Sequence, residues 1–260
     1  MENNIQPAPL KKLYLTIDDF PTAASEDMLH FLLEKDIRPI IFCIGHTLEK
    51  QKKLAVKALS EGFILGNHSY AHQHFSRLSL KDALEDIFKA DRILEEIHAT
   101  AGVAWEKKYF RFPYGDNGDG RLGRIFTRSF NPWKKLKKKA IQEKLAELGY
   151  VTPAIPGILY SYYNQTLLQE KDMHWTLDVM EWCLKKEEGM FGIQKERDVL
   201  QRLFSAKPFD CRGSVPEKQY GLPCSDSNEI VLMHDCENTF DTFKNIVNEI
   251  LSRGYTFSSF

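Results

Sequence analysis

The sequence lacks the features that mark a membrane-spanning or nucleotide-binding protein. None of its apolar runs approaches the about 20 residues that a bilayer span requires, and no GxGxxG or P-loop motif is present. The formal net charge is −1, so no general attraction to nucleic acid is indicated. The polar start, MENNIQPAPLKK, has no apolar segment of signal-peptide type. We therefore expect a cytoplasmic protein, or a periplasmic or secreted one if a signal was removed.

Cysteine is also scarce. The 260 residues hold five cysteines, an odd number without CxxC spacing, which favours a reducing compartment over a disulfide framework. Cys211 and Cys224 share one long irregular stretch. We favour an incidental pair there, with a disulfide or a loop clasp as the alternatives.

What the chain does have is a regular alternation of short apolar runs with helical patterns. We predict strands at 13–17, 38–44, 63–65, 108–112, 150–152, 174–177, 230–233 and 255–258, and helices at 25–35, 48–61, 79–98, 132–149 and 239–252. Such alternation implies parallel strands joined by right-handed crossovers, in a barrel or a doubly wound sheet. Because nucleotide-binding motifs are absent, we predict an α/β fold, a single-domain distorted (β/α) barrel with seven or eight strands.

The barrel would begin after a short extension, residues 1–12, and would occupy residues 13–260. Two stretches, 115–130 and 183–227, have no clear periodicity and are interpreted as elaborated loops of the same domain.

Polar residues gather where the predicted strands end, which is where barrel enzymes place their active sites. The stretches are Asp18-Asp19 after the first strand, GNHSYAHQH (66–74) after the third, RFPYG (111–115) at the fourth, LDVMEW (177–182) at the sixth and LMHD (232–235) at the seventh. Five such stretches at one end predict an active site at the C-terminal ends of the strands.

Two adjacent carboxylates, Asp18 and Asp19, close the first apolar run in YLTIDDFPT. Neighbouring side chains of an extended chain point to opposite faces, so one carboxylate can enter a site while the other points elsewhere. The alternative is a solvated turn, because Asp and Pro are common turn residues.

His68 and His72 are spaced i, i+4, which places both imidazoles on one face of a helical turn. Two surface histidines are the alternative. With one carboxylate from Asp18 or Asp19, the pair gives a set of two His and one Asp that suits a catalytic zinc ion or a non-haem iron. His74 is interpreted as a loop residue.

The stretches TIDDFP, HSYAH, RFPY, LDVMEW and VLMH, in this order from Thr16 to His234, resemble the motifs of the polysaccharide deacetylase family. This family is the NodB-homology domain, or carbohydrate esterase family 4. The resemblance implies a metal-dependent hydrolase that removes an N-acetyl group from an amino sugar or glycan. It also implies one divalent metal ion, zinc first, with cobalt, nickel or manganese as alternatives.

The resemblance further implies roles for the residues on the metal side of the site. Asp19, His68 and His72 would hold the ion. Asp18 would be the general base that takes the proton from the metal-bound water, and Arg111 would pair with Asp18 and keep it ionised.

The remaining motifs imply roles around the acyl group. The backbone N–H of Tyr114, in a turn shaped by Pro113, would stabilise the oxyanion. His234 would protonate the departing amine, with Asp178 holding the imidazole in its charged form. Trp182 and Leu232 would form walls of the small pocket that receives the acyl methyl group and the sugar ring.

Two positions depart from the family pattern. Phe20 stands where the family usually has Gly, which predicts a bulkier rim and keeps open an amide hydrolase of the same fold acting on a ureide or formamide. Glu181 stands where Asp is frequent, a change expected to be mild.

Rival functions of another class are an iron oxygenase, which the strand–helix alternation disfavours, and a catalytically inactive glycan-binding module. The basic run 133–144 is interpreted as a solvated helix face rather than as a grip for an acidic polymer or phospholipid surface. The expected partner is an acetylated carbohydrate or small amide substrate, without nucleic acid and without a membrane span. The oligomeric state is left open.

Overall fold

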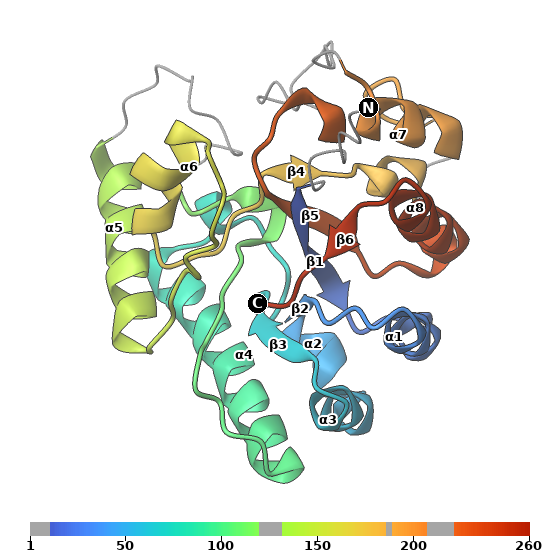
Figure 1. Cartoon of the computed structure of the whole chain (residues 1–260). Helices are drawn as coiled ribbons and strands as arrows, with labels where there is room; N and C mark the ends of the chain where they lie inside the picture. The colour runs from blue at the N-terminus through green and yellow to red at the C-terminus, as the bar shows by residue number, and fades with distance from the viewer. Residues whose placement is uncertain (1–10, 120–131, 186–188, 207–220) are drawn as a thin grey trace, which may run out of the picture.

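A central parallel sheet organises the fold (Figure 1). The computed structural model describes residues 11–119, 132–185, 189–206 and 221–260. In these ranges the strands are β1 (Lys12–Phe20), β2 (Ile40–Cys43), β3 (Ile64–Asn67), β4 (Leu177–Asp178), β5 (Glu229–His234) and β6 (Thr256–Phe257). Their order is β3-β2-β1-β5-β4, and β6 pairs with the beginning of β1. The fold is the predicted α/β distorted barrel.

The register of the sheet brings polar residues of three strands to one face. Asp18 of β1 is paired with His234 of β5, and Thr16 with Leu232. Asp178 of β4 is also paired with Leu232. Residues in register on parallel strands point the same way, and side chains alternate along each strand with period 2. All five side chains therefore belong to the inner face of the barrel.

Two predicted strands are reduced to single bridges. Segment 108–112 forms one parallel bridge on each side, Phe110 with Asn67 of β3 and Lys108 with Tyr150, and the second of these is the bridge of segment 150–152. The chain then returns at 173–178, where the N–H of Met173 donates to the carbonyl of Phe110 over 2.7 Å and β4 pairs with β5. Between β3 and β4 the barrel is therefore closed by isolated hydrogen bonds rather than by a continuous ladder.

The residues after Phe110 explain why no longer ladder forms. The carbonyl of Arg111 accepts a hydrogen bond from Nδ1 of His68 over 2.8 Å. Pro113 has no N–H to donate. The backbone that would extend the strand is thus committed to the site.

Helices surround the sheet: α1 (Ser25–Glu34), α2 (Gly45–Leu48), α3 (Lys52–Ser60), α4 (Leu80–Ala101), α5 (Pro132–Glu147), α6 (Ser161–Gln165), α7 (Glu196–Leu203) and α8 (Phe240–Ser252). The predicted helix 48–61 is wrong in its extent, because the chain forms two helices, α2 and α3. Helix α2 begins early because the N–H groups of Gly45 and His46 donate to carbonyls of the loop after β3. A Cβ at Gly45 would meet Tyr70 of that loop at 2.8 Å, so only glycine fits this contact.

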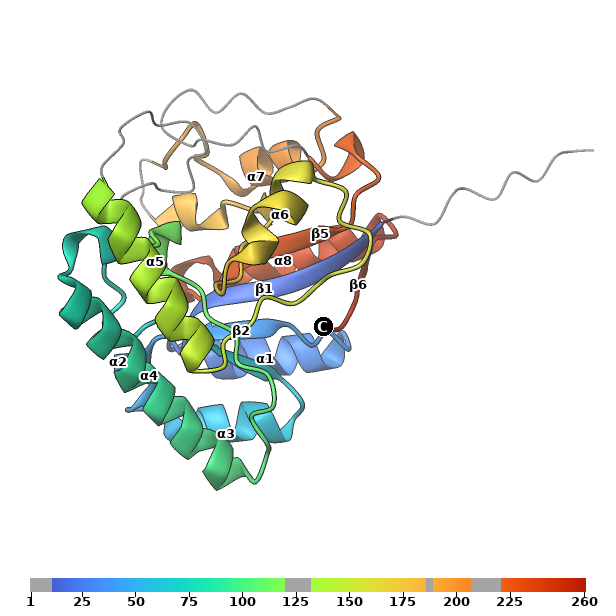
Figure 2. The same cartoon turned by 90° about the vertical axis from the view of Figure 1, so that its left-hand side faces the viewer.

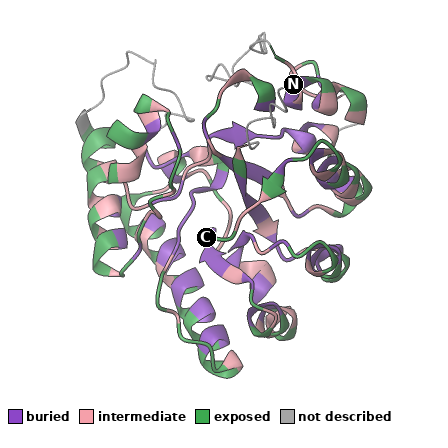
Figure 3. Cartoon of the chain, viewed as in Figure 1, coloured by how far each residue is buried: buried purple, intermediate pink, exposed green. Residues whose placement is uncertain are grey.

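The strands and the inner faces of the helices are buried, while the outer helix faces are exposed (Figure 3). The main core lies between one face of the sheet and helices that include α1 and α8. A second apolar cluster fills the barrel beneath the inner face, with Ile40, Phe42, Tyr163, Met173 and Ile230 among its members. The site described below therefore rests on a packed floor.

Helix α5 carries most of the basic run and lies beside α4 (Figure 2). Its inner face buries Ile141 and Leu145. The ammonium of Lys138 lies 2.5 Å from Glu170, and that of Lys137 donates to the carbonyls of Phe75 and Leu78. The interpretation as a solvated helix face holds for residues 133–136, which are exposed, whereas Lys137 and Lys138 make contacts within the chain.

Several predictions fall wholly or partly outside the described residues. They concern residues 1–10 of the extension, 120–130 of the first insertion, and 186–188 and 207–220 of the second, including Cys211. Cys224 is a free thiol. Within the described ranges, no helix has both the length and the apolarity that a bilayer span would require.

Candidate active site

The end of β1 brings both aspartates to the same place. The pairing of β1 with β2 shifts register between Ile17 and Phe20, and Asp19 has a φ of 72°. Nε2 of His68 consequently lies 3.6 Å from Asp18 Oδ2 and 3.7 Å from Asp19 Oδ1. The predicted division into opposite faces is therefore wrong, because the irregular backbone turns Asp19 toward the side on which Asp18 lies.

The two histidines converge, but they do so from a loop rather than from a helical turn. Ser69 and His72 both have positive φ, 69° and 51°, and the N–H of His72 donates to Ser69 Oγ. The N–H groups of Tyr70 and Ala71 donate to the carboxylate of Asp86 on α4. The ring centroids of His68 and His72 lie 5.0 Å apart. The predicted convergence is present and the predicted helical cause is wrong.

Asp19, His68 and His72 form a donor set that fits a divalent transition metal. Their ligand atoms lie within 4.8 Å of one another, and Nε2 of His72 is 3.1 Å from Asp19 Oδ1. Nδ1 of His68 bonds to the Arg111 carbonyl, so Nδ1 carries the proton and Nε2 presents its lone pair. Burial lowers the pKa of His68, which favours the neutral, ligating form.

The carboxylate of Asp19 is held in its charged form. Burial alone would raise the pKa of Asp19, but the hydrogen bond with His72 and the charge of His234 bring it well below its usual value. An ionised carboxylate with two imidazole nitrogens is the ligand class found in catalytic zinc sites.

Arg111 lies in the barrel interior and holds Asp18. Its side chain is 1% exposed, and Nη1 donates to Asp18 Oδ1 over 2.8 Å and to Thr16 Oγ1 over 2.9 Å. Its Nε donates to the Met173 carbonyl, and the guanidinium stacks 4.3 Å from the ring centroid of Phe42. The predicted contact between Arg111 and Asp18 is present.

His234 is held by Glu181 rather than by Asp178. The His234 N–H donates to Glu181 Oε1 over 2.6 Å, and Nδ1 of the same histidine lies 3.1 Å from that oxygen. The carboxylate of Asp178 instead accepts from the N–H of Met180 and the indole N–H of Trp182. The predicted contact of Asp178 with His234 is thus replaced, because the turn after β4 carries the longer Glu side chain up to the imidazole.

The environment of His234 favours its protonated form. Burial alone would lower the pKa of His234, but the hydrogen bond to Glu181 and the carboxylates of Glu181, Asp19 and Asp18 raise it to about 9. An imidazolium at the end of β5, in register with Asp18, can act as a proton donor in the site.

The rim consists of aromatic residues. Tyr114 has a φ of 59° within the turn that begins at Pro113, and its side chain is 51% exposed. Its ring stacks on His74 at 4.0 Å and lies 4.7 Å from that of His72. Its N–H belongs to the first turn of a 3₁₀ segment, where N–H groups lack partners within the helix.

The ring of Trp182 lies 6.4 Å from that of His234, and Leu232, two residues before His234 on β5, is 3% exposed. Phe20 does not belong to the rim. It is fully buried in the main core, so the predicted bulkier rim is wrong. The polypeptide turns at Phe20-Pro21 in such a way that the ring packs inward while Asp19 faces the site.

A second group that could hold a metal, Glu170, Asp172 and His174, lies against α5. Nε2 of His174 is 2.9 Å from Asp172 and 3.3 Å from Glu170, whose other oxygen pairs with Lys138. Two carboxylates opposed by an imidazolium and an ammonium need no further cation. We interpret this group as a structural ion-pair cluster.

This cluster should make stability depend on pH. Burial alone would lower the pKa of His174, but Asp172 and Glu170 raise it to about 10, above the usual value of about 6.5 for an unfolded chain. The stabilisation is therefore complete below about pH 6.5 and is lost as the pH rises through about 10. We expect the free energy of unfolding, measured by urea titration, to fall more steeply over this interval in the wild type than in His174→Gln. Parallel pH profiles of the two proteins would contradict this.

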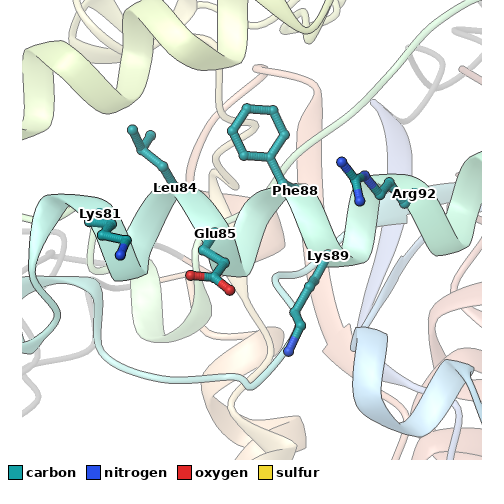
Figure 4. Close-up of a pocket in the computed structure, with 6 residues that line it drawn as sticks. All are labelled: Lys81, Leu84, Glu85, Phe88, Lys89 and Arg92. Carbon is teal, nitrogen blue, oxygen red and sulfur yellow. The ribbon is translucent and has the colours of Figure 1, made fainter.

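A surface pocket of about 530 Å³ lies elsewhere, on the outer face of α4 (Figure 4). Its lining comes from one helix: Lys81, Leu84, Glu85, Phe88, Lys89 and Arg92. None of the residues with the ligand or proton-transfer geometry described above borders it, so we place the chemistry at the strand ends and not in this pocket.

Comparisons with known proteins bear on the fold and on the family that the chain resembles. The family model described as polysaccharide deacetylase matches residues 6–124. A peptidoglycan-N-acetylglucosamine deacetylase of Bacillus cereus is 29% identical over 109 residues, which are 42% of this chain and 38% of that protein. A family 4 carbohydrate esterase from Streptomyces lividans, solved with acetate, aligns with a TM-score of 0.56 and 18% identity over 97% of this chain and 93% of that chain. A carbohydrate esterase family 4 pseudoenzyme from Bacillus anthracis also has a TM-score of 0.56 at 18% identity, over 98% of this chain and 68% of that chain.

The fold is thus that of the carbohydrate esterase family 4 proteins, a distorted barrel with a parallel sheet. The match of residues 6–124 to this family model confirms the resemblance of the motifs to the polysaccharide deacetylase family. The chain spans 66%, 38% and 29% of the lengths of three curated relatives that it matches.

Proposed function

We propose that the protein is a metal-dependent hydrolase that removes the N-acetyl group from an amino sugar of a glycan. The observation that carries the proposal is the meeting of Asp18, Asp19 and His68, with His68 Nε2 within 3.7 Å of both carboxylates. Hydrolysis of an unactivated amide needs a general base close to the ligands of a metal ion, and Asp18 lies close to Asp19 and His68 in this way. The names of relatives that act on peptidoglycan amino sugars support a glycan substrate.

Residues of the chain then divide the work. When bound, a divalent ion, zinc in our proposal, supplies Lewis-acid polarisation of the acyl carbonyl and acidifies the attacking water. Asp18 accepts the proton of that water, and Arg111 orients the carboxylate through Oδ1 so that Oδ2 faces the reacting atoms. The N–H of Tyr114 donates to the developing oxyanion.

On the leaving-group side, His234 donates its proton to the amine nitrogen. Glu181 fixes the tautomer and orientation of the imidazole through Nδ1, so that Nε2 carries the proton to be transferred. Trp182 lines the acyl and sugar site, with its indole N–H fixed by Asp178.

The rival functions lose their support. The ureide or formamide hydrolase depended on a bulky rim at Phe20, a residue that is buried. An iron oxygenase would require a fold unlike a parallel βα barrel. An inactive module, as in the pseudoenzyme that shares the fold, would be expected to lack the base or the acid, and both Asp18 and His234 are present.

The proposal is tested by acetate release from a panel of N-acetylated glycans and oligosaccharides, acetate esters, ureides and formamides, with and without added Zn²⁺. We expect release from N-acetylated glycans that depends on the metal. Turnover of ureides or formamides alone would move the protein to the rival amide hydrolase, and glycan binding without any turnover would make it a binding module.

His234 should be needed more for amides than for activated esters. His234→Ala is expected to lose on the order of 10²-fold in kcat/KM on an N-acetyl sugar and much less on an aryl acetate, whose leaving group hardly needs a proton. Because the protonated form acts, wild-type kcat/KM on the amide should fall as the pH rises through about 9. An equal loss on both substrates would assign His234 to binding instead.

Two matched variants separate the carboxylates beside His234. Glu181→Gln keeps an oxygen for Nδ1 but removes the charge, so the alkaline limb of the profile should move to lower pH. Asp178→Asn should move that limb less, because Asp178 bonds to Met180 and Trp182.

A further inference from the structure

The last residue of the turn after β4 reaches the metal-ligand set. This turn, Glu181–Lys185, begins with the carboxylate that holds His234 and ends with Lys185. The ammonium of Lys185 lies 3.2 Å from Asp19 Oδ2, on a side chain that is 34% exposed. No sequence motif pointed to this residue.

The two oxygens of Asp19 therefore face different partners. Oδ1 lies 3.1 Å from Nε2 of His72 and 3.7 Å from Nε2 of His68. Oδ2 faces the ammonium of Lys185. A carboxylate divided in this way cannot rotate about its Cβ–Cγ bond without breaking one set of contacts.

The rest of the turn is anchored independently of Lys185. Cys183 is buried, and its N–H donates to the carbonyl of Met180. The indole N–H of Trp182 donates to Asp178 on β4. Hydrogen bonds of Trp182 and Cys183 thus hold the turn without the side chain of Lys185, so replacing that side chain tests the ammonium and not the turn.

We propose that Lys185 is a positioning residue for Asp19: its ammonium occupies Oδ2 so that Oδ1 alone is presented, beside His68 and His72, to a bound cation. The inference rests on the proposed metal-dependent function. Partners that orient a ligating carboxylate typically change metal affinity by about 10- to 100-fold when they are removed. One presented oxygen also leaves room at the cation for substrate.

Charge repulsion alone predicts the opposite change in metal affinity, so the direction of the change distinguishes the two explanations. A fixed ammonium near a divalent ion repels it, so if Lys185 acted only through its charge, removing it would strengthen binding. If it acts by orienting Asp19, removing it weakens binding.

The experiment measures affinity for Zn²⁺ and Co²⁺ in the metal-stripped full-length protein by competition with a chromophoric chelator, and records the visible spectrum of the Co²⁺ form. Lys185→Met is expected to weaken binding about 10-fold or more and to change the spectrum, and Lys185→Arg to recover most of the affinity. Lys57→Met, which removes a lysine 2.8 Å from a surface Glu26, is the control and should match the wild type.

Three outcomes decide. Affinity of Lys185→Met equal to or above that of the wild type would overturn the positioning role, as would failure of Lys185→Arg to recover. His72→Ala is measured in parallel to separate the two levels of the argument. Lost binding in His72→Ala with unchanged binding in Lys185→Met removes only the inference, whereas wild-type binding in His72→Ala removes the proposed metal site itself.

Discussion

Asp19→Ala and His72→Ala are each expected to lose the bound metal and the deacetylase activity together. Each change leaves only two of the three donors that lie within 4.8 Å of one another, whereas catalytic zinc sites use three protein ligands. Elemental analysis of the purified proteins should give about one divalent ion per chain in the wild type and almost none in the variants, with activity reduced by at least about 10³-fold.

The second candidate group provides the matched control. His174→Gln removes the histidine of the Glu170–Asp172–His174 cluster, whose charges are balanced by Lys138, so metal content and activity should stay at the wild-type level. Full occupancy in His72→Ala would exclude that histidine from the ligand set. Loss of the metal in His174→Gln would show that the cluster, and not the strand-end site, holds the ion.

Asp18→Asn should separate the base from the ligands. The asparagine keeps an oxygen for Nη1 of Arg111, so the inner face of the barrel is preserved, but it cannot accept a proton. We expect full metal content and a rate reduced by on the order of 10²-fold or more, with KM little changed. The measurement combines elemental analysis with kcat and KM on the best N-acetylated substrate of the panel.

A comparison of aryl acetates, which have a good leaving group, with amides makes this test more specific. Because the base acts on the attacking water, Asp18→Asn should be impaired on aryl acetates and amides alike, in contrast to His234→Ala. A variant that lost the metal would place Asp18 among the ligands. A wild-type rate with retained metal would mean that some other group takes the proton.

The elements that the sequence predicts well are those governed by local rules. The start of α4 is an example, because Ser79 Oγ accepts from the N–H of Asp82. Buried parallel strands such as β2 and β5 are continuous apolar runs, so their existence follows from composition. The predicted strands at 108–112 and 150–152 form only isolated bridges, because a continuous ladder depends on the backbone of the neighbouring segment and not on local sequence alone.

The location of the site was also predictable, because strand ends in a barrel share one rim. The spacing of His68 and His72 identified the correct pair but for the wrong reason. An i, i+4 spacing suggests a helical turn, yet carboxylate and hydroxyl acceptors from Asp86 and Ser69 bind the loop N–H groups and allow positive φ. Convergence of the imidazoles is a tertiary effect here.

By itself, the sequence determined which chemical groups the protein has and at which end of the sheet they gather: two carboxylates at the end of β1, two histidines after β3 and one histidine at the end of β5. Only the tertiary structure decided how those groups are paired. A register shift turns Asp19 toward Asp18, and Phe20 is buried in the core. The imidazole of His234 contacts Glu181 instead of Asp178, and the ammonium of Lys185 contacts Asp19. The physical reason is that residue type and strand order follow from local propensity and periodicity, whereas a hydrogen bond of about 3 Å depends on the backbone angles of the few residues that precede it.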